Sequence, residues 1–176
     1  MKKLRIEEMN RLKLRDFQQA TKTPLTLILD DVRSGINVGS VFRTADAFRI
    51  REIILCGITP RPPHKEIQKS ALGATESVAW SYHKTIQEYL DTLKKGAEIY
   101  ALEQTHGSIP LQEIKNQAWP EYLIIGNEVH GVSETALNYC KGALEIPQFG
   151  TKHSLNVSVS TGMAVWEILK HQLPEK

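Results

Sequence analysis

Cysteine is scarce in this chain of 176 residues, which contains only Cys56 and Cys140. Two cysteines so far apart provide neither a disulfide scaffold nor the paired spacing of a zinc knuckle. No apolar run approaches the roughly 20 residues that a membrane-spanning helix needs. The charged N-terminus is not followed by the apolar segment of a secretory signal. We therefore expect a cytoplasmic protein with no membrane contact.

Sequence motifs of several common enzyme classes are also absent. There is no Walker A sequence, and no G-x-G-x-x-G follows any apolar run, which disfavours P-loop nucleotidases, Rossmann dehydrogenases and methyltransferases of the Rossmann type. No G-x-S-x-G turn is present to hold a nucleophilic serine. The six histidines form no H-E-x-x-H or other paired-ligand spacing. Neither a metal nor a serine nucleophile is expected.

Charge is distributed unevenly along the chain, although the formal net charge is only +2. Residues 1–23 hold seven Lys and Arg against three Asp and Glu, a net charge of +4, so the remainder sums to −2. Such a basic arm suits contact with phosphates. The alternative is a helix that packs on the body through Ile6, Met9 and Phe17, and one helix can do both. We expect a helical arm over 1–22 and a single domain over 23–176.

Short apolar runs alternate with amphipathic stretches from residue 25 onward. Nearly all-apolar strands that alternate with helices indicate an α/β fold, a mostly parallel sheet with helices on both faces. Three prolines predict a loop over 57–65. The expected strands lie at 25–29, 52–56, 78–82, 99–102, 122–125 and 143–146, and the expected helices at 36–48, 85–95, 133–139 and 154–172.

Three polar segments follow expected strands, at the edge where open α/β sheets bind ligands. The segments are Asn37-x-Gly39-x-x-x-Arg43-Thr44-Ala45, then Ile125-Gly126-Asn127-Glu128-x-x-Gly131, then Ile146-Pro147-x-x-Gly150 leading into Ser154-Leu155-Asn156-Val157-Ser158. In this order and spacing they resemble the SpoU/TrmH family of RNA 2′-O-ribose methyltransferases. The resemblance covers roughly residues 23–172, which is nearly the whole body.

The resemblance implies features that no hydropathy pattern can reveal. It implies a C-terminal trefoil knot, S-adenosyl-L-methionine held in the loops of that knot, and a homodimer that packs along the last helix. Taken singly, the apolar members of the implied cofactor site would be ordinary core residues, and Gly126 would merely permit a turn. A glycine there also lets the adenosyl group approach the main chain closely. The implied cofactor-binding residues are Leu102, Gly126, Ile146, Ser154 and Leu155.

Arg43 is the catalytic candidate that the resemblance emphasises. A general-base role is awkward, because a guanidinium has a pKa of roughly 12 or higher and offers donors but no acceptor. We expect Arg43 to clamp a flanking phosphate and to stabilise charge that grows on the attacking oxygen, while a solvent or phosphate oxygen takes the proton. The alternative is an ion pair with Asp46 or Asp31 on the helix surface.

Four further residues complete the catalytic set. Asn37 is expected to brace the loop before Arg43, or to cap the helix. Glu128 is expected to orient Arg43 or the RNA, or to be a surface carboxylate near a helix start. Ser154 and Asn156 would open the last helix, where free N–H groups face an anion, or would simply cap it. Asn127 stands where family members often have proline, and we expect this departure to loosen the loop.

The expected substrate is RNA, and tRNA is favoured over rRNA. The body shows no separate RNA-binding domain, so a compact target with a splayed nucleotide suits it best. Three alternatives remain open: the same activity on rRNA, a catalytically silent RNA-binding member of the fold, and an unrelated α/β enzyme with another small cofactor.

Overall fold

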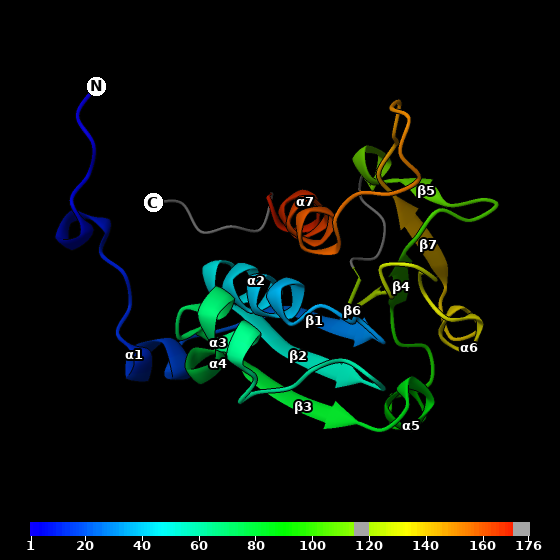
Figure 1. Ribbon diagram of the computed structural model, residues 1–176, viewed down its shortest axis with the longest axis horizontal. Coiled ribbons are helices and arrows are strands. Elements are labelled where there is room, and N and C mark those ends of the chain that lie inside the picture. Colours follow the sequence, from blue (N-terminus) through cyan, green and yellow to red (C-terminus); the bar gives the residue numbers. More distant parts are fainter. Residues whose placement is uncertain (115–119, 171–176) are drawn as a thin grey trace.

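The computed structural model describes residues 1–114 and 120–170, apart from the side chain of Ile6. Within these residues the chain forms a seven-stranded sheet in the order β3-β2-β1-β6-β4-β7-β5, and every registered pair is parallel (Figure 1). The expected mostly parallel sheet is confirmed. The strands are β1 (Thr23–Asp30), β2 (Ile50–Cys56), β3 (Ala79–His83), β4 (Ile99–Leu102), β5 (Ile109–Pro110), β6 (Tyr122–Ile125) and β7 (Gly142–Glu145).

Helices cover both faces of the sheet, because side chains alternate along each buried strand. Leu27 and Leu29 of β1 pack in one apolar cluster with α2 (Gly35–Ala47) and α7 (Val157–Leu169), whereas Ile28 between them packs in a second cluster with α5 (Ile86–Leu90) and α6 (Glu134–Leu137). None of the helices among the described residues is long and apolar enough to cross a membrane. The helical segments are η1 (Ile6–Met9), α1 (Leu14–Gln19), α2 (Gly35–Ala47), α3 (Lys65–Ala71), α4 (Ala74–Ser77), α5 (Ile86–Leu90), η2 (Leu111–Glu113), α6 (Glu134–Leu137) and α7 (Val157–Leu169).

Several element boundaries differ from the sequence-based expectation. Helix α5 ends at Leu90 rather than near residue 95, and α3, α4, β5 and η2 were not predicted. The last helix begins at Val157, and its N-cap is Asn156. The Oδ1 atom of Asn156 accepts from the backbone amides of Ser158 and Val159. Ser154 therefore lies in the preceding loop and does not cap α7. The expected end of this helix, near residue 172, lies outside the described residues.

The N-terminal arm is anchored at its second half. Phe17 of α1 is buried, and the Gln18 side chain donates to the Glu76 carbonyl of α4 (3.1 Å). The Lys22 ammonium lies 3.7 Å from the centre of the Phe17 ring. Met9 by contrast is exposed, so the predicted packing of the arm is confirmed for Phe17 and wrong for Met9, and the side chain of Ile6 lies outside the described residues.

Candidate functional site

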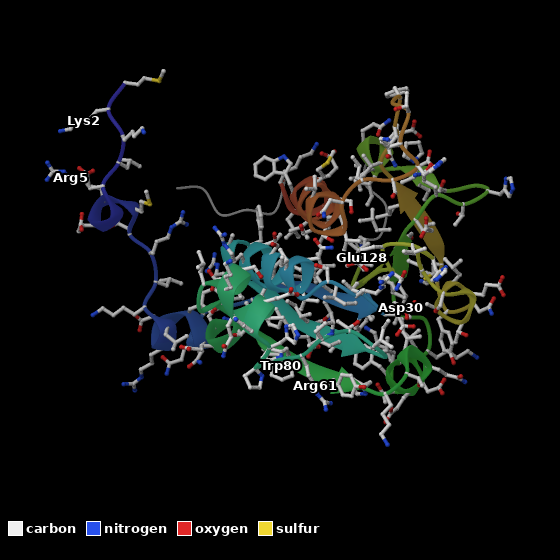
Figure 2. The ribbon with its side chains drawn as sticks, viewed as in Figure 1. Lys2, Arg5, Asp30, Arg61, Trp80 and Glu128 are labelled. Atoms are coloured by element: carbon white, nitrogen blue, oxygen red, sulfur yellow. The ribbon has the colours of Figure 1, made fainter. Side chains whose placement is uncertain are left out.

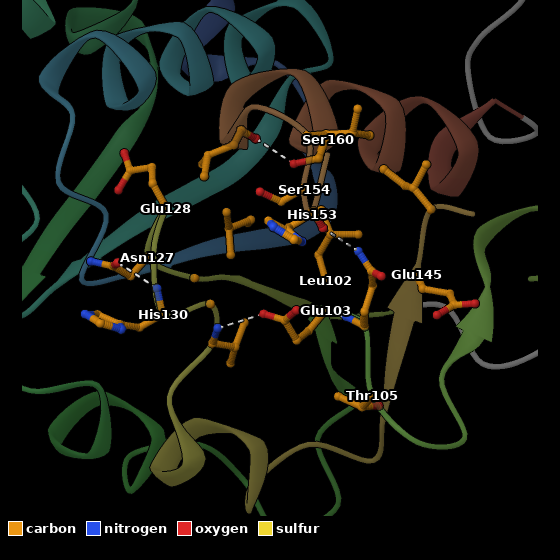
Figure 3. Close-up of a pocket in the computed structure, with 18 of the residues that line it drawn as sticks. Leu102, Glu103, Thr105, Asn127, Glu128, His130, Glu145, His153, Ser154 and Ser160 are labelled. Atoms are coloured by element: carbon orange, nitrogen blue, oxygen red, sulfur yellow. Dashed lines mark hydrogen bonds between the residues drawn. The ribbon is translucent and has the colours of Figure 1, made fainter. Parts of the chain in front are cut away.

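A cavity of about 480 Å³ opens at the carboxyl ends of β4, β6 and β7 (Figure 3). Its walls come from the loops after these strands and from the start of α7. Parallel strands end at one edge of a sheet, which is why segments far apart in sequence meet there. All five residues that the resemblance assigns to the cofactor line this cavity: Leu102, Gly126, Ile146, Ser154 and Leu155.

A chain of hydrogen bonds joins the three sequence motifs beside this cavity. The side-chain nitrogen Nδ2 of Asn37 donates to Glu128 Oε1 (2.9 Å), and Nδ2 of Asn156 donates to Asn37 Oδ1 (3.1 Å). Asn37 is buried in the first turn of α2, so both of its polar atoms are satisfied within the protein. The three side chains come from one motif each, and the contacts fix the relative position of all three loops.

Glu128 also holds the entrance of α2. Its two oxygens accept from the backbone amides of Arg33 (2.8 Å) and Ser34 (3.0 Å). Burial alone would raise the pKa of Glu128, but these hydrogen bonds and the one from Asn37 together lower it below its ordinary value. The N-cap of α2 is Ser34, whose Oγ accepts from the Asn37 amide, so Asn37 braces the loop and does not cap the helix.

Two residues of the second motif differ from expectation. A Cβ on Gly126 would lie 2.1 Å from the Gly131 carbonyl carbon and 2.2 Å from the Val132 nitrogen, so the glycine makes room for the chain's own backbone. Asn127 does not loosen the loop. Its Oδ1 accepts from the amides of Val129 and His130, and its Nδ2 donates to the Asp31 carbonyl at 2.7 Å.

Among the described residues, the formally charged side chains that line the cavity are all acidic, namely Glu103, Glu128 and Glu145. The lining also includes His130 and His153, and apolar side chains form much of the remaining wall. Sequence analysis missed Glu103, whose carboxylate accepts from the amides of Gln104 and Val132 (both 2.9 Å). Its place directly after a strand was the available signal. Such a lining suits a ligand with an apolar body and a positive charge, as S-adenosylmethionine has at its sulfonium.

Arg43 does not line this cavity. It lies six residues after Asn37, about 9 Å further along α2, and its side chain is exposed at a second hollow. The alternative ion pair with Asp46 or Asp31 is wrong within the described residues. Asp46 accepts instead from the Ser77 hydroxyl, and Asp31 from the Ile58 amide.

Comparison with known proteins decides the family. The model of the SpoU rRNA Methylase family matches residues 24–166. The chain belongs to the SpoU rRNA methylase family. Among the described residues of this SpoU family member, no group of three His, Cys, Asp or Glu is placed to hold a metal ion.

Relatives of this SpoU chain are named for both rRNA and tRNA. The chain is 30% identical over 172 residues to a 23S rRNA (guanosine-2′-O-)-methyltransferase of Neisseria meningitidis, covering 93% of this chain and 66% of that protein. It is 28% identical over 167 residues to a tRNA (guanosine(18)-2′-O)-methyltransferase of Thermus thermophilus, covering 94% of this chain and 84% of the relative.

Solved structures agree with the fold. An AdoMet-bound rRNA methyltransferase from Sinorhizobium meliloti superposes with a TM-score of 0.79 at 26% identity, over 90% of this chain and 61% of that one. A TrmH/SpoU tRNA modifying enzyme of A. aeolicus gives a TM-score of 0.77 at 25% identity, over 90% of this chain and 80% of that one. The chain thus spans about two thirds of the length of several of the proteins that it matches.

Proposed function

We propose that this chain transfers a methyl group from S-adenosyl-L-methionine to a ribose 2′-hydroxyl of RNA. The observation that carries the proposal is the hydrogen-bonded chain Glu128–Asn37–Asn156, which joins the three motifs beside a single cavity. Family membership and relatives named as RNA 2′-O-methyltransferases support the same conclusion.

The cavity residues fit this cofactor. Leu102, Ile146 and Leu155 offer apolar walls to an adenine ring, and the Ser154 hydroxyl at the same wall offers a polar partner. The three carboxylates of the lining favour a cation over a neutral ligand. The cofactor supplies an activated methyl group and a neutral thioether as leaving group. The bound adenosyl group would lie against the loop that Gly126 keeps compact.

The protein's contribution is to position the ribose and to stabilise charge. Glu128 and Asn37 fix the start of α2 and so the helix that carries Arg43. Arg43 clamps a phosphate next to the target ribose and stabilises negative charge that develops on the 2′-oxygen. Solvent or a phosphate oxygen takes the proton, because a guanidinium cannot.

A homodimer would complete this site. Helix α7 exposes Val159, Met163 and Trp166 at a helical spacing, which makes an apolar stripe on its outer side. We propose that a second copy covers this stripe, as the family resemblance implies. Arg43 lies on α2, which contacts α7, and it does not line the cavity of its own chain. It would therefore act at the cavity of the other copy.

Three finer features belong to the same proposal. The C-terminal part is a trefoil knot, in keeping with the family and with β6 lying between β1 and β4 in the sheet. The protein acts in the cytoplasm, in keeping with free Cys56 and Cys140. The substrate is tRNA rather than rRNA, in keeping with the relative named for tRNA, of which this chain covers 84%.

Methyl transfer to defined RNAs tests the proposal. Wild-type protein, labelled S-adenosylmethionine and unmodified tRNA transcripts should give labelled tRNA, and mapping should place the label on a ribose. Label on 23S rRNA alone would move the substrate to rRNA. Binding of S-adenosylhomocysteine without any transfer would indicate a catalytically silent RNA-binding member. Absence of binding at millimolar ligand would overturn the cofactor assignment.

A further inference from the structure

The second hollow lies between the N-terminal arm and the body. Its volume is about 780 Å³, and its walls come from residues 10–17 on one side and from α2, α3 and α4 on the other. Figure 1 shows α1 beside α3 and α4, with the rest of the arm extending beyond them. Three guanidinium groups line the hollow, those of Arg11, Arg43 and Arg49.

The guanidinium groups of these arginines form no ion pair with the described residues. Within the described residues none of the three takes part in an ion pair or donates a side-chain hydrogen bond. Two carboxylates, Asp46 and Glu76, also line the hollow, so the positive groups there outnumber the negative ones by one. Burial, and next the charge of Arg49, lower the pKa of the neighbouring Lys22. The hollow therefore keeps a net positive charge, and its three arginines form no ion pair with any residue that the structure describes.

The rest of the lining suits a nucleotide rather than an isolated anion. Leu12, Leu14 and Leu72 are exposed there, with 50%, 45% and 71% of their surface accessible. Arginine forks bind phosphate groups in pairs of hydrogen bonds, and apolar side chains cover the faces of unstacked bases and riboses. A volume of this size accommodates a nucleotide, since ligand sites commonly measure about 300–1,000 Å³.

We infer that this hollow binds the RNA backbone at nucleotides that flank the methylated one. The inference rests on the proposed function and adds a site that the cofactor cavity does not contain. Arg43 belongs both to the hollow and to the first motif. RNA bound in the hollow would therefore contact the same arginine that is proposed to act at the target ribose. Lys2 and Arg5 extend the basic charge outward along the same arm (Figure 2).

The arm wall of the hollow is anchored to the body next to the proposed binding surface. Phe17 is buried under α4, and the Gln18 side chain ties the arm to the Glu76 carbonyl. Arg11 lies just before this anchored segment, and Arg49 lies two residues after the end of α2, on the body side of the hollow. The two residues can be changed without touching Arg43 or the cofactor cavity.

The test uses the double variant Arg11→Ala/Arg49→Asn. Asparagine is chosen because Arg49 has a φ of +50°, a conformation that asparagine tolerates better than alanine. The matched control is Lys84→Ala/Lys95→Ala, which removes two exposed positive charges elsewhere on the surface. Binding of an unmodified tRNA transcript is measured for each protein across a range of salt concentrations.

We expect the double variant to bind this tRNA about tenfold more weakly or worse, and its salt slope to fall by about 1.5, as loss of two phosphate contacts requires. The control should match wild type, and S-adenosylhomocysteine affinity should be unchanged in all proteins. Arg11→Ala alone, at an exposed position, should give about half the change in slope and serves if the double variant is unstable.

An unchanged slope in both Arg11 variants, or an equal loss in the control, would overturn the inference. Failure of the proposed function gives a different result: wild-type protein would bind no S-adenosylhomocysteine or transfer no methyl group, whatever its RNA affinity. Equal loss of affinity for a DNA duplex of matched length would also count against a site for splayed RNA.

Discussion

The two hollows of this molecule have opposite charge. Among the described residues, three carboxylates and no Lys or Arg line the cavity at the ends of β4, β6 and β7, whereas three arginines and two carboxylates line the hollow under the arm. The proposed methyl donor carries a positive sulfonium and the proposed acceptor is a polyanion. Helix α2 contributes to both regions, with Asn37 near the cavity and Arg43 at the hollow. The comparison indicates that the charge of each hollow matches its proposed ligand: the acidic cavity suits the cationic methyl donor, and the arginine-lined hollow suits the anionic RNA.

Replacement of Arg43 should give the largest effect on activity while leaving the cofactor cavity intact, because Arg43 lines only the second hollow. We expect Arg43→Ala to lower kcat by about 10²–10³ through loss of a charge-stabilising donor. S-adenosylhomocysteine affinity, measured by calorimetry, should stay within a factor of about two. Arg43→Lys should recover little activity, since an ammonium cannot form the paired phosphate contact. A large loss of cofactor affinity would contradict the assignment of Arg43 to the RNA-binding hollow rather than to the cofactor cavity.

Substitution of Gly126 should damage the cavity alone. A Cβ in Gly126→Ala would collide with backbone atoms of Gly131 and Val132, which cannot move as a flexible side chain would. We expect the free energy of unfolding, measured in urea, to fall by about 3 kcal/mol, with weaker cofactor binding. Gly142→Ala is the control, because its Cβ would meet only the Tyr100 ring at 3.5 Å. Equal stability of the two variants would refute this explanation of Gly126.

Strand β1 and helices α3 and α4 show which elements a local sequence pattern can predict and which it cannot. Strand β1 was predictable because Leu27, Ile28 and Leu29 are buried on both faces, which leaves an unbroken apolar run. The short helices α3 and α4 follow a proline-rich loop, and Leu72 separates them in a left-handed conformation, so they have no sustained period.

The site was predictable as motifs and not as contacts. The side chains of Asn37 and Asn156 meet across 119 residues of chain, and no local pattern encodes that distance. Arg43 lies on a predicted helix, but the hollow that it lines forms only where the arm packs against the body, with Phe17 buried. Glu103 follows a predicted strand, but its partner Val132 lies in another loop.

Glu128 connects the cavity to the start of α2, and its charge should matter moderately. We expect Glu128→Gln to lose about 2 kcal/mol of stability at pH 7, because a neutral amide accepts more weakly from the two backbone amides. The folded pKa is lowered, so the carboxylate stabilises the protein above its unfolded pKa, and this contribution is lost as the pH falls through the folded value. Urea unfolding at several pH values should show the two proteins converging only at acid pH.

Glu103 should give the smallest and most selective effect. Neutralising it in Glu103→Gln removes one of the three charges of the cavity while keeping an oxygen for the Val132 amide. Affinity for S-adenosylmethionine should fall about fivefold, whereas affinity for the uncharged thioether of S-adenosylhomocysteine should hardly change. Glu134→Gln, an exposed carboxylate that does not line the cavity, should alter neither. Equal losses for both ligands would mean that Glu103 only supports the loop. A loss confined to the sulfonium ligand would tie the acidic lining to the donor, as the contrast with the arginine hollow requires.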